Sequence, residues 1–127
     1  MSVSDKPRAA VRYAPGDGET RPWGSWEVLA IGEGYAVKRI VVNPDQRLSL
    51  QYHHHRSERW TIVAGTGEVQ VDEELFVVQR GDHVHIPILA RHRLRNHGDE
   101  PLVLVEVQMG EVVDEADIVR LSDDYGR

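Results

Sequence analysis

The sequence predicts an all-β domain, on the evidence of short apolar runs, regularly spaced turn residues and the lack of a long helical repeat. Runs rich in Val, Ile, Leu and Trp alternate with turn sequences such as Gly32-Glu33-Gly34 and Asn43-Pro44-Asp45. No segment of about 12 or more residues has apolar side chains at the 3.6-residue spacing of an amphipathic helix. This organisation is typical of an antiparallel sandwich or barrel, and not of alternating strands and helices.

The expected strands follow one another with few residues between them. They cover Ser25–Ala30, Tyr35–Val42, Arg47–His55, Trp60–Ala64, Glu68–Val71, Leu75–Val78, His83–Ile88, His92–Arg95 and Leu102–Met109. Asp117–Leu121 is expected to form a short edge strand or a turn. Residues 1–20 are rich in Pro, Gly and charge, which predicts an N-terminal arm ahead of a single barrel over residues 21–127.

Composition excludes several classes of function. A chain of 127 residues is long enough for one core and too short for two domains of ordinary size. The net charge of -6 argues against nucleic acid as the main partner, since phosphate binding needs a basic surface. Without cysteine there are no disulfides, thiolate ligands or cysteine nucleophiles. The lack of an apolar run of about 18 residues and of an apolar N-terminal segment predicts a cytoplasmic protein with no membrane partner.

Two histidines, a glutamine and a glutamate are spaced so that a small β-barrel can bring them together. Side chains alternate between the two faces of a strand, so Gln51 and His53 share one face of Arg47–His55. Glu58 follows after enough residues to turn a corner, and His92 arrives from a distant strand. Imidazole, carboxylate and amide oxygen all bind first-row divalent cations. We therefore predict a metal site at these four residues, with open positions that favour catalysis or substrate binding over a structural role.

The opposite face of Arg47–His55 carries Leu48 and Leu50. If Gln51 and His53 point into the barrel, these leucines form an outward apolar stripe that needs a cover. The N-terminal arm or a second subunit would supply it, and we therefore predict a homodimer.

The same residues fall within two motifs that resemble those of the cupin superfamily. The first motif, G-x5-H-x-H-x3,4-E-x6-G, matches at His53, Glu58 and Gly65, with Gln51 at its first histidine and Asp45 at its initial glycine. The second motif, G-x5-P-x-G-x2-H-x3-N, matches at Gly81, Pro87, His92 and Asn96, with Leu89 in place of the middle glycine. The resemblance implies a single-domain cupin barrel, which is a double-stranded β-helix or jelly roll.

A narrower resemblance covers almost the whole expected barrel. The segments Arg21–Trp26, Val37–Ile40, Arg47–Arg56, Glu106–Gln108, Asp117–Arg120 and Asp124–Arg127 are similar to those of type II mannose-6-phosphate isomerases. That family implies a metal-dependent aldose-ketose isomerase that interconverts mannose 6-phosphate and fructose 6-phosphate through an enediolate. The implied cofactor is a divalent metal, Zn2+ first and Mn2+, Co2+ or Ni2+ as alternatives. In that family the domain often follows a sugar-nucleotide pyrophosphorylase domain, and this chain has room for the isomerase half alone.

The implied reaction gives roles to further residues. His55 shares the face of the metal ligands and is the first candidate for a base that titrates near neutrality, or an alternative ligand. Glu106 is the second candidate, because it shares a core-facing side with Gln108, and a buried carboxylate is costly unless it is paired. Gln108 is expected to contact substrate. Arg47 and Lys38 are the candidates for the phosphate, and Lys38 also for catalysis.

Two other classes of function are compatible with the same motifs, because a fold does not determine its chemistry. One is a metal-binding cupin that binds sugar phosphates without turnover. The other is a cupin enzyme of oxygenase-type chemistry, although Gln51 at the first ligand position favours a redox-inert metal. An assay with mannose 6-phosphate, run with and without a chelator, separates these alternatives.

Overall fold

The computed structural model describes residues 10–125. All regular secondary structure within these residues is β-strand, as predicted. The strands are β1 (Ala10–Val11), β2 (Gly18–Arg21), β3 (Gly24–Gly32), β4 (Tyr35–Val42), β5 (Leu50–Tyr52), β6 (Arg56–Ala64), β7 (Thr66–Val71), β8 (Glu74–Gln79), β9 (His83–Ile86), β10 (His92–Arg95), β11 (Leu102–Gly110), β12 (Val112–Val113) and β13 (Val119–Ser122). The described residues contain no helix that could cross a membrane. Residues 1–9 of the expected arm, and Gly126-Arg127, lie outside the described residues.

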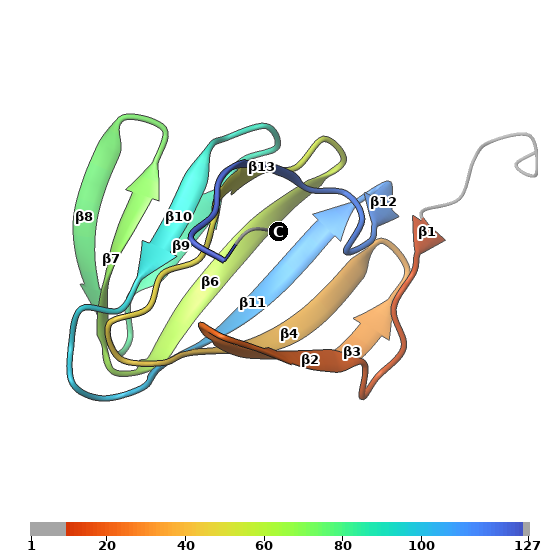
Figure 1. Ribbon diagram of the computed structural model, residues 1–127. Coiled ribbons are helices and arrows are strands. Elements are labelled where there is room, and N and C mark those ends of the chain that lie inside the picture. Colours follow the sequence, from red (N-terminus) through yellow and green to blue (C-terminus); the bar gives the residue numbers. More distant parts are fainter. Residues whose placement is uncertain (1–9, 126–127) are drawn as a thin grey trace, which may run out of the picture.

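Two antiparallel sheets enclose the core (Figure 1). The six-stranded sheet has the order β2-β3-β4-β11-β6-β9, and the five-stranded sheet has the order β13-β5-β10-β7-β8. The small remaining sheet pairs β1 with β12 in parallel. Most neighbours in these sheets are distant in sequence, so the interior is lined from both ends of the chain.

Strict alternation along β11 determines which of its side chains reach the interior. Leu102 and Leu104 are fully buried in the core, and Glu106 and Gln108 continue the same face with exposed fractions of only 3% and 1%. β11 lies between β4 and β6, so its inward residues stand in the middle of the larger sheet. The expectation that Glu106 and Gln108 face the core is confirmed.

Part of the segment expected to be an arm belongs to the barrel. Gly18–Arg21 pairs with β3 as the edge of the six-stranded sheet. Tyr13 is buried in the core, where its ring meets that of Trp26 edge-on at 6.1 Å. The prediction of an arm without core residues is therefore wrong for this stretch, because an aromatic side chain supplies apolar burial that Pro and Gly content does not reveal.

The predicted outward leucine stripe is also wrong. Within Arg47–His55 only Leu50–Tyr52 is a regular strand, and Arg47 makes an isolated bridge to Arg95. Leu48 and Ser49 are both buried although they are adjacent in sequence, so the alternation of faces is broken there. Leu48 points into the same interior as Gln51 and needs no cover from a second subunit.

Both residues that replace motif glycines have left-handed backbone conformations. Asp45 has φ +62° and Leu89 has φ +68°. Asp tolerates this region better than most residues, whereas a leucine there is strained. The two chain reversals are thus preserved, and the second is stabilised by a hydrogen bond from the Leu89 amide to the His53 carbonyl at 2.9 Å.

Candidate metal centre and active-site cavity

A cavity between the two sheets contains most of the polar side chains that are buried. Its lining residues come from β3, β4, β5, β6, β10, β11 and β13, together with the loops beside them. Three of the predicted metal ligands line it and are almost fully buried: His53 at 2%, Glu58 at 2% and His92 at 3% exposure. Polar groups held this far from water need partners, and the partners identify the chemistry of the site.

The candidate ligand atoms of His53, Glu58 and His92 all lie within 4.8 Å of one another. His53 is beside the corner at the end of β5, Glu58 is on β6 and His92 is on β10, as the corner argument predicts. Gln51 lines the same cavity and is the Cα partner of His92 across the β5–β10 pair. The four residues predicted from the sequence as metal ligands therefore all line one cavity, and three of them, His53, Glu58 and His92, form a close cluster.

The two imidazoles are oriented for metal binding by backbone carbonyl groups. His53 Nδ1 lies 2.6 Å from the Asp117 carbonyl oxygen, and His92 Nδ1 lies 2.9 Å from the Ala90 carbonyl oxygen. A carbonyl only accepts, so each Nδ1 donates, and in the neutral ring Nε2 then carries the lone pair. Burial lowers the pKa of His53 to about 4, which keeps its ring neutral at pH 7. This is the arrangement of ligand and outer partner that metal-binding histidines use, so the residues fit a divalent cation.

Arg56 is a member of this cluster that the sequence interpretation missed. Its Nε donates to Glu58 Oε2 at 2.9 Å, its Nη2 lies 3.4 Å from His53 Nε2, and its Nη1 donates to the Asp114 carbonyl at 2.8 Å. Burial would raise the pKa of Glu58, but the Arg56 guanidinium, the two histidines and the hydrogen bond from Trp60 together hold that pKa well below its usual range. The alternation of side chains along β6 could have predicted this position, because Arg56 and Glu58 are two residues apart and share a face of the strand.

A second cluster surrounds Lys38 of β4 and draws its residues from β3 and from the segments that follow β1 and β12. The Lys38 ammonium donates to Tyr13 Oη at 2.8 Å and to Glu115 Oε2 at 2.7 Å, and it lies 4.2 Å from the centre of the Trp26 ring. Tyr13 Oη donates in turn to Glu115 Oε2 at 2.9 Å. Lys38 is thus held in the cavity as a charged group with satisfied partners.

Glu106 has no such cation bonded to its carboxyl group. Burial, and then the charge of Glu58, raise the pKa of Glu106 to about 8, even though Lys38 acts in the opposite direction. Gln108 Nε2 donates to Glu106 Oε1 at 2.7 Å and fixes the carboxyl group on the cavity wall. A carboxyl group that titrates near neutrality inside a cavity is typical of an acid-base catalyst.

Several buried polar atoms of cavity residues have no hydrogen-bond partner among the described residues. They are the amide oxygen Oε1 of Gln108 and the indole Nε1 of both Trp23 and Trp26. Together they offer one acceptor and two donors in a space that is largely closed to water. Such orphaned groups are expected where a ligand with hydroxyl groups completes the hydrogen bonds.

The charges that line the cavity favour an anionic ligand. Lys38, Arg56 and Arg120 are cationic, and Glu58 and Glu115 are carboxylates whose pKa values are lowered by the cations beside them despite their burial. The protonated form of Glu106 is neutral below its raised pKa. A cation bound by the ligand cluster would add further positive charge.

Two predicted site residues, His55 and Arg47, lie outside the cavity. His54 and His55 form a bend between β5 and β6, where the alternation from His53 no longer holds, and the backbone amides of both donate to the Asp117 carboxylate. The His55 side chain is exposed and does not line the cavity, so its predicted inward position is wrong. Arg47 is also outside the cavity, because its guanidinium makes two hydrogen bonds to Asp124 at the surface, at 2.6 and 2.9 Å.

Sequence comparison identifies the family of this arrangement. The family described as mannose-6-phosphate isomerase C-terminal matches residues 16–123. The chain is 49% identical to the alginate biosynthesis protein AlgA of Pseudomonas putida and 45% identical to mannose-1-phosphate guanylyltransferase of Escherichia coli, over 84% of this chain in each case. It spans only 22% of the length of both relatives.

Structural comparison supports the predicted fold. An uncharacterised conserved protein with a double-stranded β-helix domain, from Klebsiella pneumoniae, superposes with a TM-score of 0.66 at 21% identity, over 94% of each chain. At that identity the likeness concerns the fold alone. It confirms the double-stranded β-helix that the two motifs implied.

Proposed function

The chain belongs to the mannose-6-phosphate isomerase C-terminal family, and on this premise we propose that it interconverts mannose 6-phosphate and fructose 6-phosphate. One observation carries the proposal: a single cavity is lined by the buried His53-Glu58-His92 cluster and by a buried acid, Glu106, whose pKa is raised to about 8. An aldose-ketose isomerase needs both an electrophilic site for the sugar oxygens and a base for the carbon-bound proton.

Gln51, His53, Glu58 and His92 would hold a divalent cation, for which we propose Zn2+ first and Mn2+, Co2+ or Ni2+ as alternatives. When bound, the cation would act as a Lewis acid that stabilises negative charge on the sugar oxygens at C1 and C2. Glu58 is the one carboxylate in this ligand set, so the ligands leave much of the charge of the ion uncompensated. The carbonyl groups of Asp117 and Ala90 keep both imidazoles in the tautomer that binds metal through Nε2.

Glu106 is our candidate for the base, in place of His55, which is exposed. Its carboxylate would remove the proton from C2, and the electron pair of that C–H bond would form the C1–C2 double bond of an enediolate. The electron pair of the C1 carbonyl bond would move to O1, Glu106 would return its proton to C1, and the proton of the O2 hydroxyl would pass to O1 as the C2 carbonyl forms, which gives fructose 6-phosphate. Gln108 keeps the carboxyl oriented through the hydrogen bond at 2.7 Å.

The remaining cavity residues would bind the rest of the sugar phosphate. We propose Arg120 for the phosphate, instead of Arg47, because Arg120 lines the cavity from β13 and is the Cα partner of Gln51. Lys38 would add positive charge from the opposite sheet. Gln108 Oε1 and the indole N–H groups of Trp23 and Trp26 have the hydrogen-bonding capacity that sugar hydroxyl groups require.

A coupled assay with mannose 6-phosphate tests the proposal on metal-loaded and chelator-treated protein. We expect turnover that is lost with the chelator and recovered with Zn2+ or Mn2+. His53→Ala should lose both metal and activity, measured by elemental analysis and by the assay, whereas His55→Ala should retain both. Calorimetric binding of mannose 6-phosphate without turnover would support the alternative of a sugar-phosphate binding domain and would overturn the isomerase proposal.

A further inference from the structure

The outer surface of the six-stranded sheet is apolar where a solvent-facing sheet should be polar. β11 lies in the middle of this sheet, and its outward residues are Val103, Val105, Val107 and Met109. An antiparallel strand with one face in water alternates apolar and polar residues, whereas a strand covered on both faces is apolar throughout. The outward side of β11 is therefore that of a covered strand.

Neighbouring strands extend the same apolar surface. The exposed or half-exposed apolar side chains on it are Leu29 of β3, Tyr35, Val37 and Val41 of β4, and Val63 of β6. Four of the large hydrophobic residues that are most exposed in the described chain belong to this sheet surface: Leu29, Tyr35, Val63 and Met109. Contiguous apolar patches of this kind mark interaction surfaces.

We propose that a second copy of this chain covers the surface, with the six-stranded sheets of two copies packed face to face. Strand lengths and a spacing of about 4.8 Å give the sheet an area of roughly 650 Å². That is close to the area of about 800 Å² per partner in stable dimers. The inference depends on the sheet surface and is independent of the isomerase activity.

The charges on this surface suit a two-fold arrangement. Glu27 on β3 and Arg59 on β6 lie on opposite sides of the central strands β4 and β11. A two-fold axis between β4 and β11, parallel to the strands, brings β6 of one copy over β3 of the other. Arg59 of each copy then approaches Glu27 of its partner, while Arg39 already pairs with Glu27 within its own copy at 2.6 Å. The centre of the interface contains the valines of β11 together with Arg39 of β4, which is the Cα partner of Val105 and keeps its pairing with Glu27.

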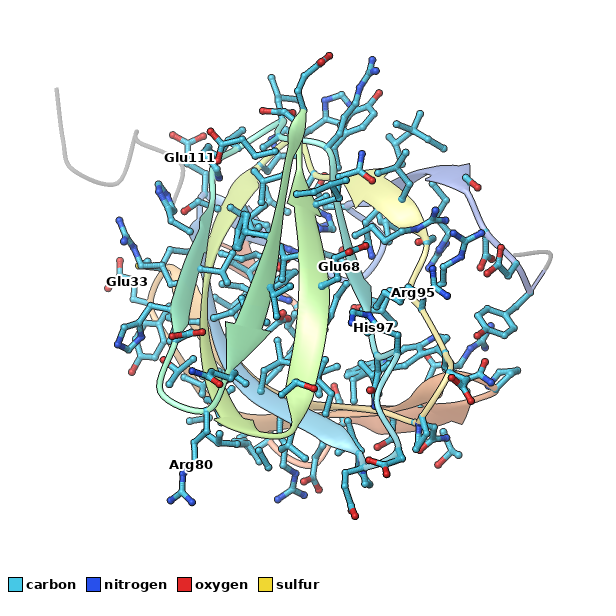
Figure 2. All side chains as sticks on the ribbon, turned by 90° about the vertical axis from the view of Figure 1, so that its left-hand side faces the viewer. Glu33, Glu68, Arg80, Arg95, His97 and Glu111 are labelled. Atoms are coloured by element: carbon cyan, nitrogen blue, oxygen red, sulfur yellow. The ribbon has the colours of Figure 1, made fainter. Side chains whose placement is uncertain are left out.

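Sedimentation velocity across the micromolar range tests the proposal on the full chain. We expect a dimer for the wild type and a monomer for Val105→Lys, with the dissociation constant raised on the order of 100-fold or more by a desolvated charge. The matched control is Val77→Lys on β8, in the sheet that faces the viewer in Figure 2, where a valine of 68% exposure lies away from the proposed interface. Circular dichroism and retained zinc binding show that each variant is folded.

Opposite outcomes overturn the proposal. A wild-type protein that is monomeric at every concentration would show that a second copy does not cover this surface. If Val77→Lys dissociates the dimer and Val105→Lys does not, the interface is at β8 and not on the six-stranded sheet. Charge exchange tests the two-fold axis: Arg59→Glu should weaken the dimer, and adding Glu27→Lys should restore it, so a double variant that remains monomeric would exclude this arrangement.

Discussion

Glu106→Gln should remove a pH dependence of stability that one buried acid imposes on the metal-free protein. The raised pKa of Glu106, about 8 in the folded state, means that folding binds a proton which the unfolded chain releases near its ordinary value of 4.5. This contribution to stability is complete below the unfolded pKa and is lost as pH rises through the folded pKa. The wild-type protein should therefore become less stable toward pH 8.

The protonation of His53 limits the pH range in which the effect of Glu106 on stability can be measured. Burial lowers the pKa of His53 to about 4 from the ordinary 6.5, so its contribution increases stability with pH over that interval and opposes that of Glu106. Above pH 6.5 the contribution of His53 fades, because the unfolded histidine loses its proton there, and Glu106 dominates. One proton corresponds to about 1.4 kcal/mol per pH unit well below the folded pKa and to half of that at pH 8, so the free energy of unfolding should fall by on the order of 1 kcal/mol between pH 6.5 and 8.

Urea denaturation in the presence of a chelator, at intervals between pH 6.5 and 8, measures this slope. Glu106→Gln should abolish it, whereas Glu33→Gln, an exposed position in the β3–β4 turn, should leave it unchanged (Figure 2). If the metal-loaded protein catalyses the proposed isomerisation, the same Glu106 variant should lower kcat by about 100-fold or more, because a positioned base contributes that much. An equal slope in the wild type and in Glu106→Gln would refute the assignment of the raised pKa to this residue.

Three further variants follow from the fold. Leu89→Gly should raise the free energy of unfolding by about 1 kcal/mol in urea, because glycine relieves the φ of +68°, and destabilisation would contradict the strain argument. Asn96→Ala should lower the free energy of unfolding by on the order of 3 kcal/mol, because the buried side chain donates to the Val42 and Glu100 carbonyls and accepts from the Gly98 amide. A small change in the thermal midpoint would show that water replaces these hydrogen bonds. Arg47→Ala should leave kcat/KM unchanged, because its ion pair lies outside the cavity, and a large rise in KM would return it to the phosphate site.

The residues of the candidate metal centre could be predicted from the sequence because their arrangement depends on local rules. Alternation places Gln51 and His53 together, and a short corner brings Glu58 back on the next strand. The same rule identified Glu106 and Gln108, since β11 keeps its alternation over its whole length. In each case a regular strand, or a turn of known length, was enough.

The predictions that were wrong or incomplete concern residues whose positions depend on irregular backbone or on contacts distant in sequence. His55 follows a bend, and Leu48 precedes a regular strand of only three residues, so counting by twos gives the wrong face for both. The environment of Lys38 depends on Tyr13 and Glu115, which are 102 residues apart in sequence and meet only in the folded chain. No local pattern encodes such a meeting.

Asp117 gives the segment that follows β12 an influence on ion affinity. Its carbonyl accepts from His53 Nδ1, and its carboxylate accepts from the amides of His54 and His55, so one residue fastens this segment to the corner that holds a ligand. In a cation-loaded centre, attachment of the segment and binding of the cation would be thermodynamically linked, so each would strengthen the other by the same factor. Anything that detaches residues 114–122 should loosen the ion, and saturation with the ion should protect that segment from proteases and hydrogen exchange.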